Sequence, residues 1–275
     1  MNLVKAELLK IWTTSTWWIF AIIMFPLWAA AILLNWGSAN ISAQNSVDAS
    51  DTSLQAEQVR AAGEAVNIAA NLYTSGQFLG LLIVLLLSSI VVTNEYFHLT
   101  ATTTFLVTPV RQRVVLAKLA VSVLVGLVFW LFMTVFNLIL VPIFLDQLNI
   151  GSHLGDPAIW RAIGLNALAF AIWAILGVGA GVLIRSQLAA TLTLTITYLV
   201  GSFAANILFF VLSSQVAEWL SKLEVIVPTS ASALMIAGTD LPGNPPRWVG
   251  AAILIGYALV TGVIGTAIMK RRDIS

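Results

Sequence analysis

The six long apolar stretches of this 275-residue chain constrain its fold more than any other feature. An α-helix needs about 20 apolar residues to cross the hydrocarbon core of a bilayer. Stretches of about that length or longer lie at about 17–36, 76–93, 119–145, 159–184, 188–212 and 248–269. Because a spanning segment has to satisfy its backbone hydrogen bonds without water, we expect six transmembrane helices.

The low content of charged residues supports the same conclusion. Charged residues make up 9% of the chain and hydrophobic residues 59%, whereas a soluble domain carries about 25% charged residues. The first apolar run is longer than the ~7–15-residue core of a signal peptide, so it is expected to be an uncleaved first span. The sequence therefore predicts an all-α integral membrane protein with one transmembrane domain over residues 1–275.

Several classes of function lack the residues that they require. A net charge of +1 with no clustered basic face argues against a nucleic-acid partner. The chain has no cysteine, which removes disulfides and thiolate chemistry, and His98 and His153 lack further metal-ligand residues nearby. There is no Gly-Lys pair and hence no phosphate-binding P-loop. We expect no catalytic residue, no metal and no cofactor in this chain.

The distribution of Lys and Arg predicts the orientation. Six spans place both termini on one side, and basic residues are enriched in cytoplasmic loops. The side of the termini would carry nine basic residues: Lys5, Lys10, Arg111, Arg113, Lys118, Arg185, Lys270, Arg271 and Arg272. The other side would carry four: Arg60, Arg161, Lys222 and Arg247. We therefore expect a multi-pass protein of the cell membrane (plasma or inner) with cytoplasmic termini.

Two segments outside the spans have helical periodicity. Residues 1–15 form an amphipathic pattern that favours an interfacial helix, with Val4, Leu8, Ile11 and Trp12 on one face. The outer segment 37–75 is expected to be irregular to about residue 53 and then helical into the second span.

The outer segment 213–247 is expected to be helical with a break. The helical run covers 215–225 and stops at Pro228. After the break, Thr229 or Ser230 is suited to cap a short helix through Ala237. That helix is too short to span and apolar enough to form a re-entrant element.

The polar residues within the spans have two readings that the sequence leaves open. No Asp, Glu, Lys or His is expected in mid-span, which argues against an ion-coupled carrier. The amides and hydroxyls there either bond one helix to another or line a pathway; they are Asn137, Asn166, Asn206, Thr193 and Thr197. Gly76/Gly80 and Gly177/Gly181 have the spacing that permits close helix packing.

The inner loop 94–117, between the second and third spans, is the most informative segment. It holds Glu95, three threonines in a row, and Pro109 followed by Arg111 and Arg113. Such a segment is either a solvated loop or a short helix that docks on a cytoplasmic partner.

Two motifs resemble the permease subunit of type-2 ATP-binding-cassette (ABC) transporters. The N-terminal sequence AELLKIWTTSTWW matches that family's opening pattern at Glu7, Lys10, Thr13 and Trp17. The inner loop matches at Glu95, Tyr96, Thr100, Thr103, Pro109 and Arg111, and Lys118 follows. The break at Pro228 resembles the family's outer re-entrant helices. Leu99 departs from the family's frequent glycine, while His98 keeps a polar residue before it.

The resemblance implies a transport subunit that is driven by other chains. Two permease copies or paralogues would pair, and two separate ATPase subunits would bind ATP and magnesium. The inner loop would be a coupling helix, with contact residues Glu95, Tyr96, His98, Thr100, Thr103, Pro109, Arg111 and Arg113. The interfacial helix, with Glu7, Lys10, Trp12 and Trp17, would slide along the inner leaflet. The resemblance favours export. The expected absence of buried charge and the many aromatic residues favour a hydrophobic or amphipathic substrate such as a drug, peptide or lipid-like compound. The alternatives are a non-transporting scaffold or sensor and, less favoured, a membrane-embedded enzyme.

Overall fold

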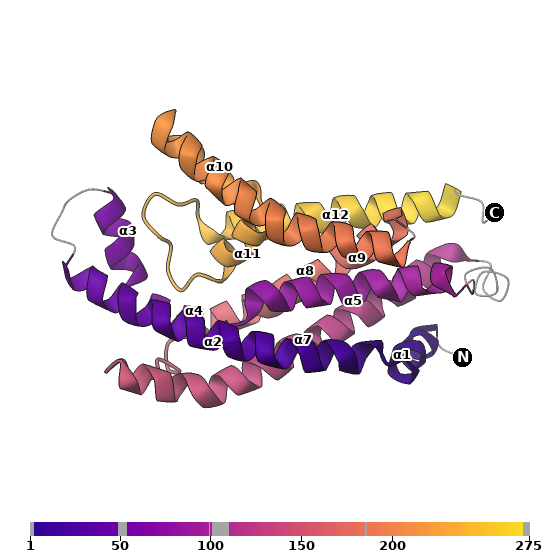
Figure 1. Cartoon of the computed structure of the whole chain (residues 1–275), viewed down its shortest axis with the longest axis horizontal. Helices are drawn as coiled ribbons and strands as arrows, with labels where there is room; N and C mark the ends of the chain where they lie inside the picture. The colour runs from indigo at the N-terminus through magenta and orange to yellow at the C-terminus, as the bar shows by residue number, and fades with distance from the viewer. Residues whose placement is uncertain (1–2, 49–53, 99, 101–109, 185, 272–275) are drawn as a thin grey trace.

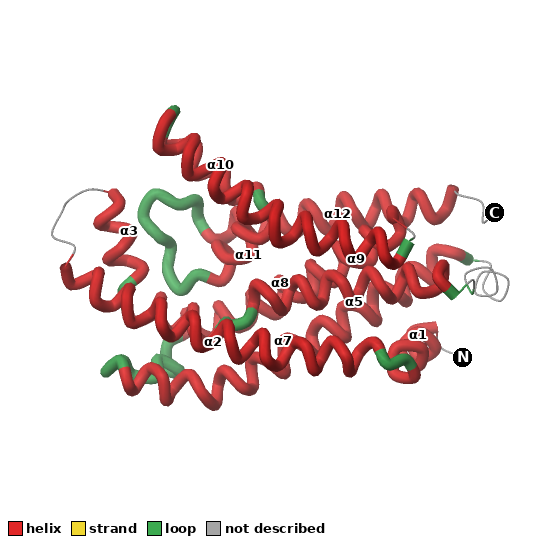
Figure 2. Tube along the Cα trace, viewed as in Figure 1, coloured by secondary structure: helices red, strands yellow, loops and turns green. Residues whose placement is uncertain are grey.

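The computed structural model describes residues 3–48, 54–98, 100, 110–184 and 186–271. Every regular element in these ranges is helical, and Figure 2 shows helices joined by loops, the longest described loop lying between α11 and α12. Six helical segments are long and apolar enough to cross a membrane: Thr16–Gln44, Ala65–Phe97, Gln112–Gln147, Pro157–Ile184, Gln187–Gln215 and Arg247–Gly265. The six predicted spans are thereby confirmed, and the chain has the architecture of a multi-pass membrane protein.

The spans run along the long axis of the molecule (Figure 1). They are formed by α2 (Thr16–Asp48), α4 and α5 (Ala65–Tyr73 and Gln77–Phe97), α7 (Arg111–Gln147), α8 (Pro157–Ile184), α9 and α10 (Gln187–Ile196 and Ser202–Gln215) and α12 (Arg247–Arg271). Helix α1 (Leu3–Thr13) and helix α3 (Leu54–Ala62) lie at opposite ends of the bundle. We call these the α1 end and the α3 end.

Helix α5 belongs to the most deeply buried of the six spans and packs most extensively on α8. The two backbones approach closely because glycines of α8 face α5. A Cβ atom added to Gly181 would lie 2.7 Å from the carbonyl oxygen of Ser89, and Gly177 is equally crowded. The predicted role of Gly177 and Gly181 in close helix packing is therefore confirmed.

The outer surface of the bundle is apolar. Large side chains on α9 and α10 are mostly exposed, among them Leu188 and Phe210 at 71% each. Similar side chains are exposed on α2 and α12. Such a surface is solvated by lipid chains and is too apolar for water, which agrees with the spanning assignment.

Residues 37–48, which were predicted to be irregular, are helical instead. Helix α2 continues to Asp48 and packs against α3. Its polar residues are accommodated because short side chains bond the helix backbone. Ser38 donates to the carbonyl of Asn35 (2.9 Å) and Asn40 donates to the carbonyl of Trp36 (2.9 Å). The predicted helix over 54–73 is present, but it is divided into α3 and α4.

The segment before the last span differs in its cap. A 3₁₀ helix (Glu218–Ile226) precedes α11 (Pro228–Ile236), which begins at Pro228 with Val227 at the N-cap. The prediction that Thr229 or Ser230 caps this helix was wrong, because proline fits the first helical position, where no N–H is needed. The hydroxyl of Thr229 donates to Ser202 instead (2.9 Å).

A π-helical turn (Thr197–Gly201) joins α9 to α10 within the fifth span. Before this turn, the threonines of 191–195 alternate with apolar residues as in a β-strand, yet the segment is helical. A helix satisfies its own backbone hydrogen bonds in lipid, and an isolated strand cannot. The turn directs the buried Tyr198 at the start of α5, where its hydroxyl donates to the carbonyl of Phe78 (2.6 Å).

Candidate functional site at the α1 end

Lys118 is the most deeply buried charged residue that the structure describes, with 1% of its side chain exposed. The sequence placed it in the inner loop, but α7 begins at Arg111 and carries Lys118 into the bundle. Its Nζ lies 2.8 Å from Glu7 Oε2 and 3.0 Å from Glu95 Oε1, and it also donates to the carbonyl of Val91 (3.2 Å). A buried ammonium requires such partners.

Lys10 completes a group of four charges. Its Nζ lies 2.6 Å from Glu7 Oε1 and 2.6 Å from Glu95 Oε1. Glu7 and Glu95 are 4% and 6% exposed. The ion cluster therefore consists of Glu7, Lys10, Glu95 and Lys118, two acids and two bases with no net charge. It joins α1, α5 and α7 at a single point.

The contacts within the cluster keep Glu7 and Lys10 ionised. Burial alone would raise the pKa of Glu7, but Lys118 and Lys10 outweigh it and lower that pKa. Burial alone would lower the pKa of Lys10, but its hydrogen bonds to Glu7 and Glu95 raise it. Both groups are therefore charged at neutral pH, and the joint between the helices is ionic.

A small cavity of about 290 Å³ adjoins the cluster between α1 and α5. Its polar wall consists of Glu7, Lys10, Thr13, Thr14, Thr16, Asn94, Glu95, His98 and Thr100. His98 and Thr100 stand where α5 ends and the inner loop begins, and the backbone N–H of Thr100 donates to the carbonyl of Glu95 (2.9 Å). The ion cluster thus lies directly at the base of that loop.

The structure describes most of the residues predicted to couple the chain to a partner. Glu95 is in the cluster, Tyr96 is half-buried, and His98, Thr100 and Arg113 are exposed. Arg111 is the first residue of α7. Thr103 and Pro109, and with them the predicted coupling helix, lie outside the described residues. The coupling role of these residues stays a prediction.

Helix α1 directs a charged side chain toward the bundle. Glu7 is its buried residue, whereas Leu9 and Trp12 are 60% and 71% exposed. Trp12 stacks on Trp17 with ring centroids 4.7 Å apart, across the bend between α1 and α2. The four residues predicted for an interfacial helix thus divide into two that bind the bundle, Glu7 and Lys10, and two that form a stacked aromatic pair in which Trp12 is exposed and Trp17 is half-buried.

The five residues considered as pathway lining do not form one surface. Asn137 and Asn166 are buried on α7 and α8, whereas Thr193, Thr197 and Asn206 are exposed on the fifth span. Asn137 accepts from Trp28 Nε1 (2.8 Å) and donates to the carbonyls of Tyr73 and Ser75 (3.0 Å each). For Asn137 the geometry favours the helix-to-helix reading.

Sequence reasoning missed the pairing that builds the site. Each of the two motifs was seen to contain an acid and a base, but they were assigned separate roles. Charged residues are rare in this chain, and the four of the cluster lie in α1, at the end of α5 and near the start of α7. Because a buried charge needs a partner of opposite sign, their presence in these helices was a signal that they pair with one another. Within the described residues, no group of three or more His, Cys, Asp or Glu is arranged to hold a metal ion.

Comparison with known proteins adds no family: no family model matches the chain, and no curated protein matches it. The chemistry of the site therefore has to be argued from its own geometry.

Proposed function

We propose that this chain is the transmembrane permease subunit of an ABC transporter and that separate ATPase subunits drive it from the α1 end. The observation that supports this most strongly is the ion cluster. It fastens α1, α5 and α7 together where the inner loop leaves the bundle. A force applied to that loop would move three helices as one unit.

Burial is what makes the cluster suitable for transmitting force. Separating one buried ion from its partners leaves an uncompensated charge, which costs about 3–5 kcal/mol. An exposed ion pair is worth about 0–1 kcal/mol and would yield under load. Because Lys118 contacts both acids, displacement of α5 or α1 is resisted by α7.

The proposed orientation puts this end in the cytoplasm. The excess of Lys and Arg on the side of the termini supports that topology. The cluster and both ends of the inner loop then face the compartment that holds ATP. The chain has no P-loop, so ATP and magnesium would be bound by two partner subunits. The exposed apolar faces of the bundle would be covered by lipid and by a second permease copy or paralogue.

The proposed cargo is hydrophobic or amphipathic, and the proposed direction is export. Bundle residues near mid-membrane offer amides and aromatic rings rather than charges, which suits uncharged or amphipathic molecules. In this proposal α11, packed against α8 and α12, is the re-entrant element that controls release at the far side.

ATP turnover of the assembled complex tests the proposal. The chain would be co-purified with the ABC ATPase encoded beside it and reconstituted in nanodiscs. Glu95→Lys breaks the cluster, and Arg113→Glu reverses an exposed charge at the start of α7 without touching the cluster. We expect each to lower the coupled ATPase rate at least about tenfold.

Lys222→Glu is the matched control, because Lys222 is exposed and lies in the segment before α11, away from the cluster. It should leave the rate unchanged. If no ATPase co-purifies, or if Glu95→Lys and Arg113→Glu leave turnover at the control level, the chain is not a coupled permease. A non-transporting scaffold or sensor then becomes the better description.

A further inference from the structure

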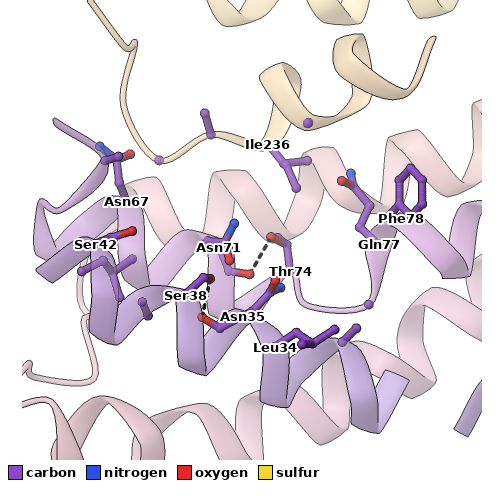
Figure 3. Close-up of a pocket in the computed structure, with 18 of the residues that line it drawn as sticks. Leu34, Asn35, Ser38, Ser42, Asn67, Asn71, Thr74, Gln77, Phe78 and Ile236 are labelled. Atoms are coloured by element: carbon purple, nitrogen blue, oxygen red, sulfur yellow. Dashed lines mark hydrogen bonds between the residues drawn. The ribbon is translucent and has the colours of Figure 1, made fainter. Parts of the chain in front are cut away.

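A second cavity, of about 560 Å³, lies toward the α3 end between α2, α4, the start of α5 and α11 (Figure 3). Its size falls within the ~300–1,000 Å³ of pockets that hold drug-sized ligands. None of the functional residues predicted from the sequence lines it. It also shares no residue with the cavity beside the ion cluster.

Two rows of uncharged polar side chains face this cavity from different helices. Asn35, Ser38 and Ser42 follow one face of α2 at helical spacing. Asn67, Asn71 and Thr74 follow one face of α4 and the turn after it. Figure 3 shows these side chains around the cavity, with Gln77 and Phe78 at one end and Ile236 across from α2. The remaining lining is apolar, including Leu34, Ile68 and Leu79.

Most of these polar groups are already committed to the protein. Asn67 donates to the carbonyl of Ala61 and to Thr239 (2.7 Å each) and accepts from the N–H of Thr239 (2.8 Å). Thr74 donates to the carbonyl of Ala70 (2.7 Å). These contacts fix the wall in place and leave these groups little capacity for a ligand.

Other groups on the wall keep free capacity. Within the described part of the chain, the side-chain amide of Asn71 makes no hydrogen bond, and Asn71 is exposed to the cavity. Asn35 donates to Ser75 (2.9 Å) and Gln77 donates to the carbonyl of Ser232 (3.4 Å). No group among the described residues donates to the side-chain oxygen of either. The cavity thus offers one free amide and two further acceptors on a largely apolar wall.

The charge of the wall is equally informative. Among the described residues that line the cavity there is no Asp, Glu, Lys, Arg or His. A charged ligand here would lose its hydration without gaining an ionic partner, which is strongly unfavourable. An uncharged ligand with hydroxyl or amide groups along one edge would form hydrogen bonds with the free amide of Asn71 and with the side-chain oxygens of Asn35 and Gln77. Its apolar body would contact the apolar wall.

From these observations we infer that the cavity is a binding site for an uncharged amphipathic molecule, with Asn71, Asn35 and Gln77 as its hydrogen-bonding residues. The inference concerns binding alone and does not require that an ATPase drives the chain. Both a transported substrate and a resident neutral lipid have this chemistry.

Photo-crosslinking of the full chain in nanodiscs tests the inference with three matched probes. The first is a 1-monoacylglycerol with a diazirine in its acyl chain. The second and third are a fatty acid and an alkylamine with the diazirine at the same carbon. We expect the neutral probe to label segments 30–42 and 67–79, and excess unlabelled monoacylglycerol to abolish that labelling. The charged probes should label these segments at least about tenfold less.

Two variants locate the site, and each has a matched control. Ser38→Phe fills the cavity and should reduce labelling about tenfold, whereas Ile41→Phe, on an exposed face of the same helix outside the cavity, should not. Asn71→Leu should weaken competition by monoacylglycerol about fivefold, as expected for one lost hydrogen bond. Asn40→Leu, outside the lining, should have no effect.

Because Asn71 is exposed and its side-chain amide makes no hydrogen bond within the described residues, its replacement by Leu leaves the fold intact even if Ser38→Phe does not fold. Equal labelling of 30–42 and 67–79 by all three probes would show ordinary solvation by acyl chains and overturn the inference. So would labelling that Ser38→Phe and Asn71→Leu leave unchanged.

Discussion

The two ends of the bundle are joined internally by different chemistry. At the α1 end, four charged side chains connect α1, α5 and α7. Toward the α3 end, amides, hydroxyls and indoles make the connections. Asn137 links α7 to Trp28 of α2 and to the turn before α5, and Trp173 Nε1 donates to Ser232 of α11 (2.8 Å).

The difference has a mechanical meaning. A buried charge cannot leave its partner without a cost of several kcal/mol, so the α1 end should move as one unit. A neutral hydrogen bond contributes about 0.5–1.5 kcal/mol and can be exchanged for a bond to a ligand. The α3 end, where the larger cavity lies, is therefore the part that can rearrange. A protein that transmits force at one end and binds a ligand at the other would need one end that moves as a unit and another that can rearrange.

Removing Lys118 should have the largest effect on stability. Lys118→Met keeps the length of the side chain but leaves Glu7 and Glu95 buried with Lys10 as their only base in the cluster. We expect the free energy of unfolding to fall by about 3–5 kcal/mol. It would be measured by SDS titration in micelles with tryptophan fluorescence as the readout.

A second substitution separates loss of charge pairing from loss of packing. Adding Glu7→Gln to Lys118→Met makes one orphaned carboxylate neutral, so part of the lost stability should return. Lys222→Met, at an exposed site, should change stability by less than about 0.5 kcal/mol. A loss below 1 kcal/mol for Lys118→Met, or no recovery in the double variant, would show that the cluster does not hold the helices.

Replacing Asn137 should have the next largest effect, and it tests the neutral joint. Asn137→Leu removes three hydrogen bonds and leaves the indole N–H of Trp28 buried without an acceptor. We expect a loss of about 2–3 kcal/mol, smaller than for Lys118 because no charge is stranded. The same titration measures it, with Asn206→Leu on the exposed face of α10 as the control. A loss as large as that of Lys118→Met would erase the distinction between the two ends.

The spans were predictable from sequence because their cause is local. Apolar length alone selects a transmembrane helix, since nothing else satisfies the backbone in lipid. Helix ends that depend on neighbours were less predictable. Small polar residues at 37–48 indicated a loop, yet they form helix because α3 packs against α2 there. Pro228 indicated a break, and in the structure it opens the next helix.

The candidate site was predictable only in part. The N-terminal and inner-loop motifs drew attention to Glu7, Lys10 and Glu95, but no local pattern says that Lys10 and Glu95, 85 positions apart in sequence, are ion partners. Lys118 was assigned to a loop because a lysine is unfavourable inside an apolar helix. That penalty disappears when two carboxylates converge on it, and convergence is a property of the tertiary fold. The larger cavity was missed for the same reason, because its walls come from α2, α4, α5 and α11.

The effect of pH on the contact between α1 and the bundle should be smaller than the effect of Lys118→Met or of Asn137→Leu. Its direction follows from the pKa values of Glu7 and Lys10. The pKa of Glu7 is lowered from its ordinary 4.5, so its stabilisation is present above pH 4.5 and is lost as pH falls through the lower folded value. The pKa of Lys10 is raised from 10.5, so its stabilisation is present below that pH and is lost as pH rises through the higher value. Helix α1 should be most firmly held between these limits.

Hydrogen exchange measures this window, with rates corrected for intrinsic pH dependence and peptides of α11 as the internal reference. Below the lowered pKa of Glu7, the protection of the α1 amides should fall by about tenfold for each pH unit by which the fold lowers that pKa. Glu7→Gln should remove the acid limb. Equal pH dependence in α1 and α11 would contradict the assignment of the buried charged contacts to the α1 end.

The smallest effect is expected at an ion pair near the α3 end, which makes it a stringent test of the role of burial. Arg247 Nε lies 2.8 Å from Asp240 Oδ1, as close as the contacts of Lys118, but the side chain of Asp240 is 59% exposed. The N–H and guanidinium of Arg247 lower the pKa of Asp240, yet water solvates the carboxylate when the pair opens. Asp240→Asn should therefore cost at most about 1 kcal/mol in the same titration. Arg247 would keep its bonds to the carbonyls of Ala237 and Gly238. If Asp240→Asn destabilised the protein as much as Lys118→Met, distance rather than burial would decide the strength of these ion pairs. The α1 end would then be no more rigid than the α3 end.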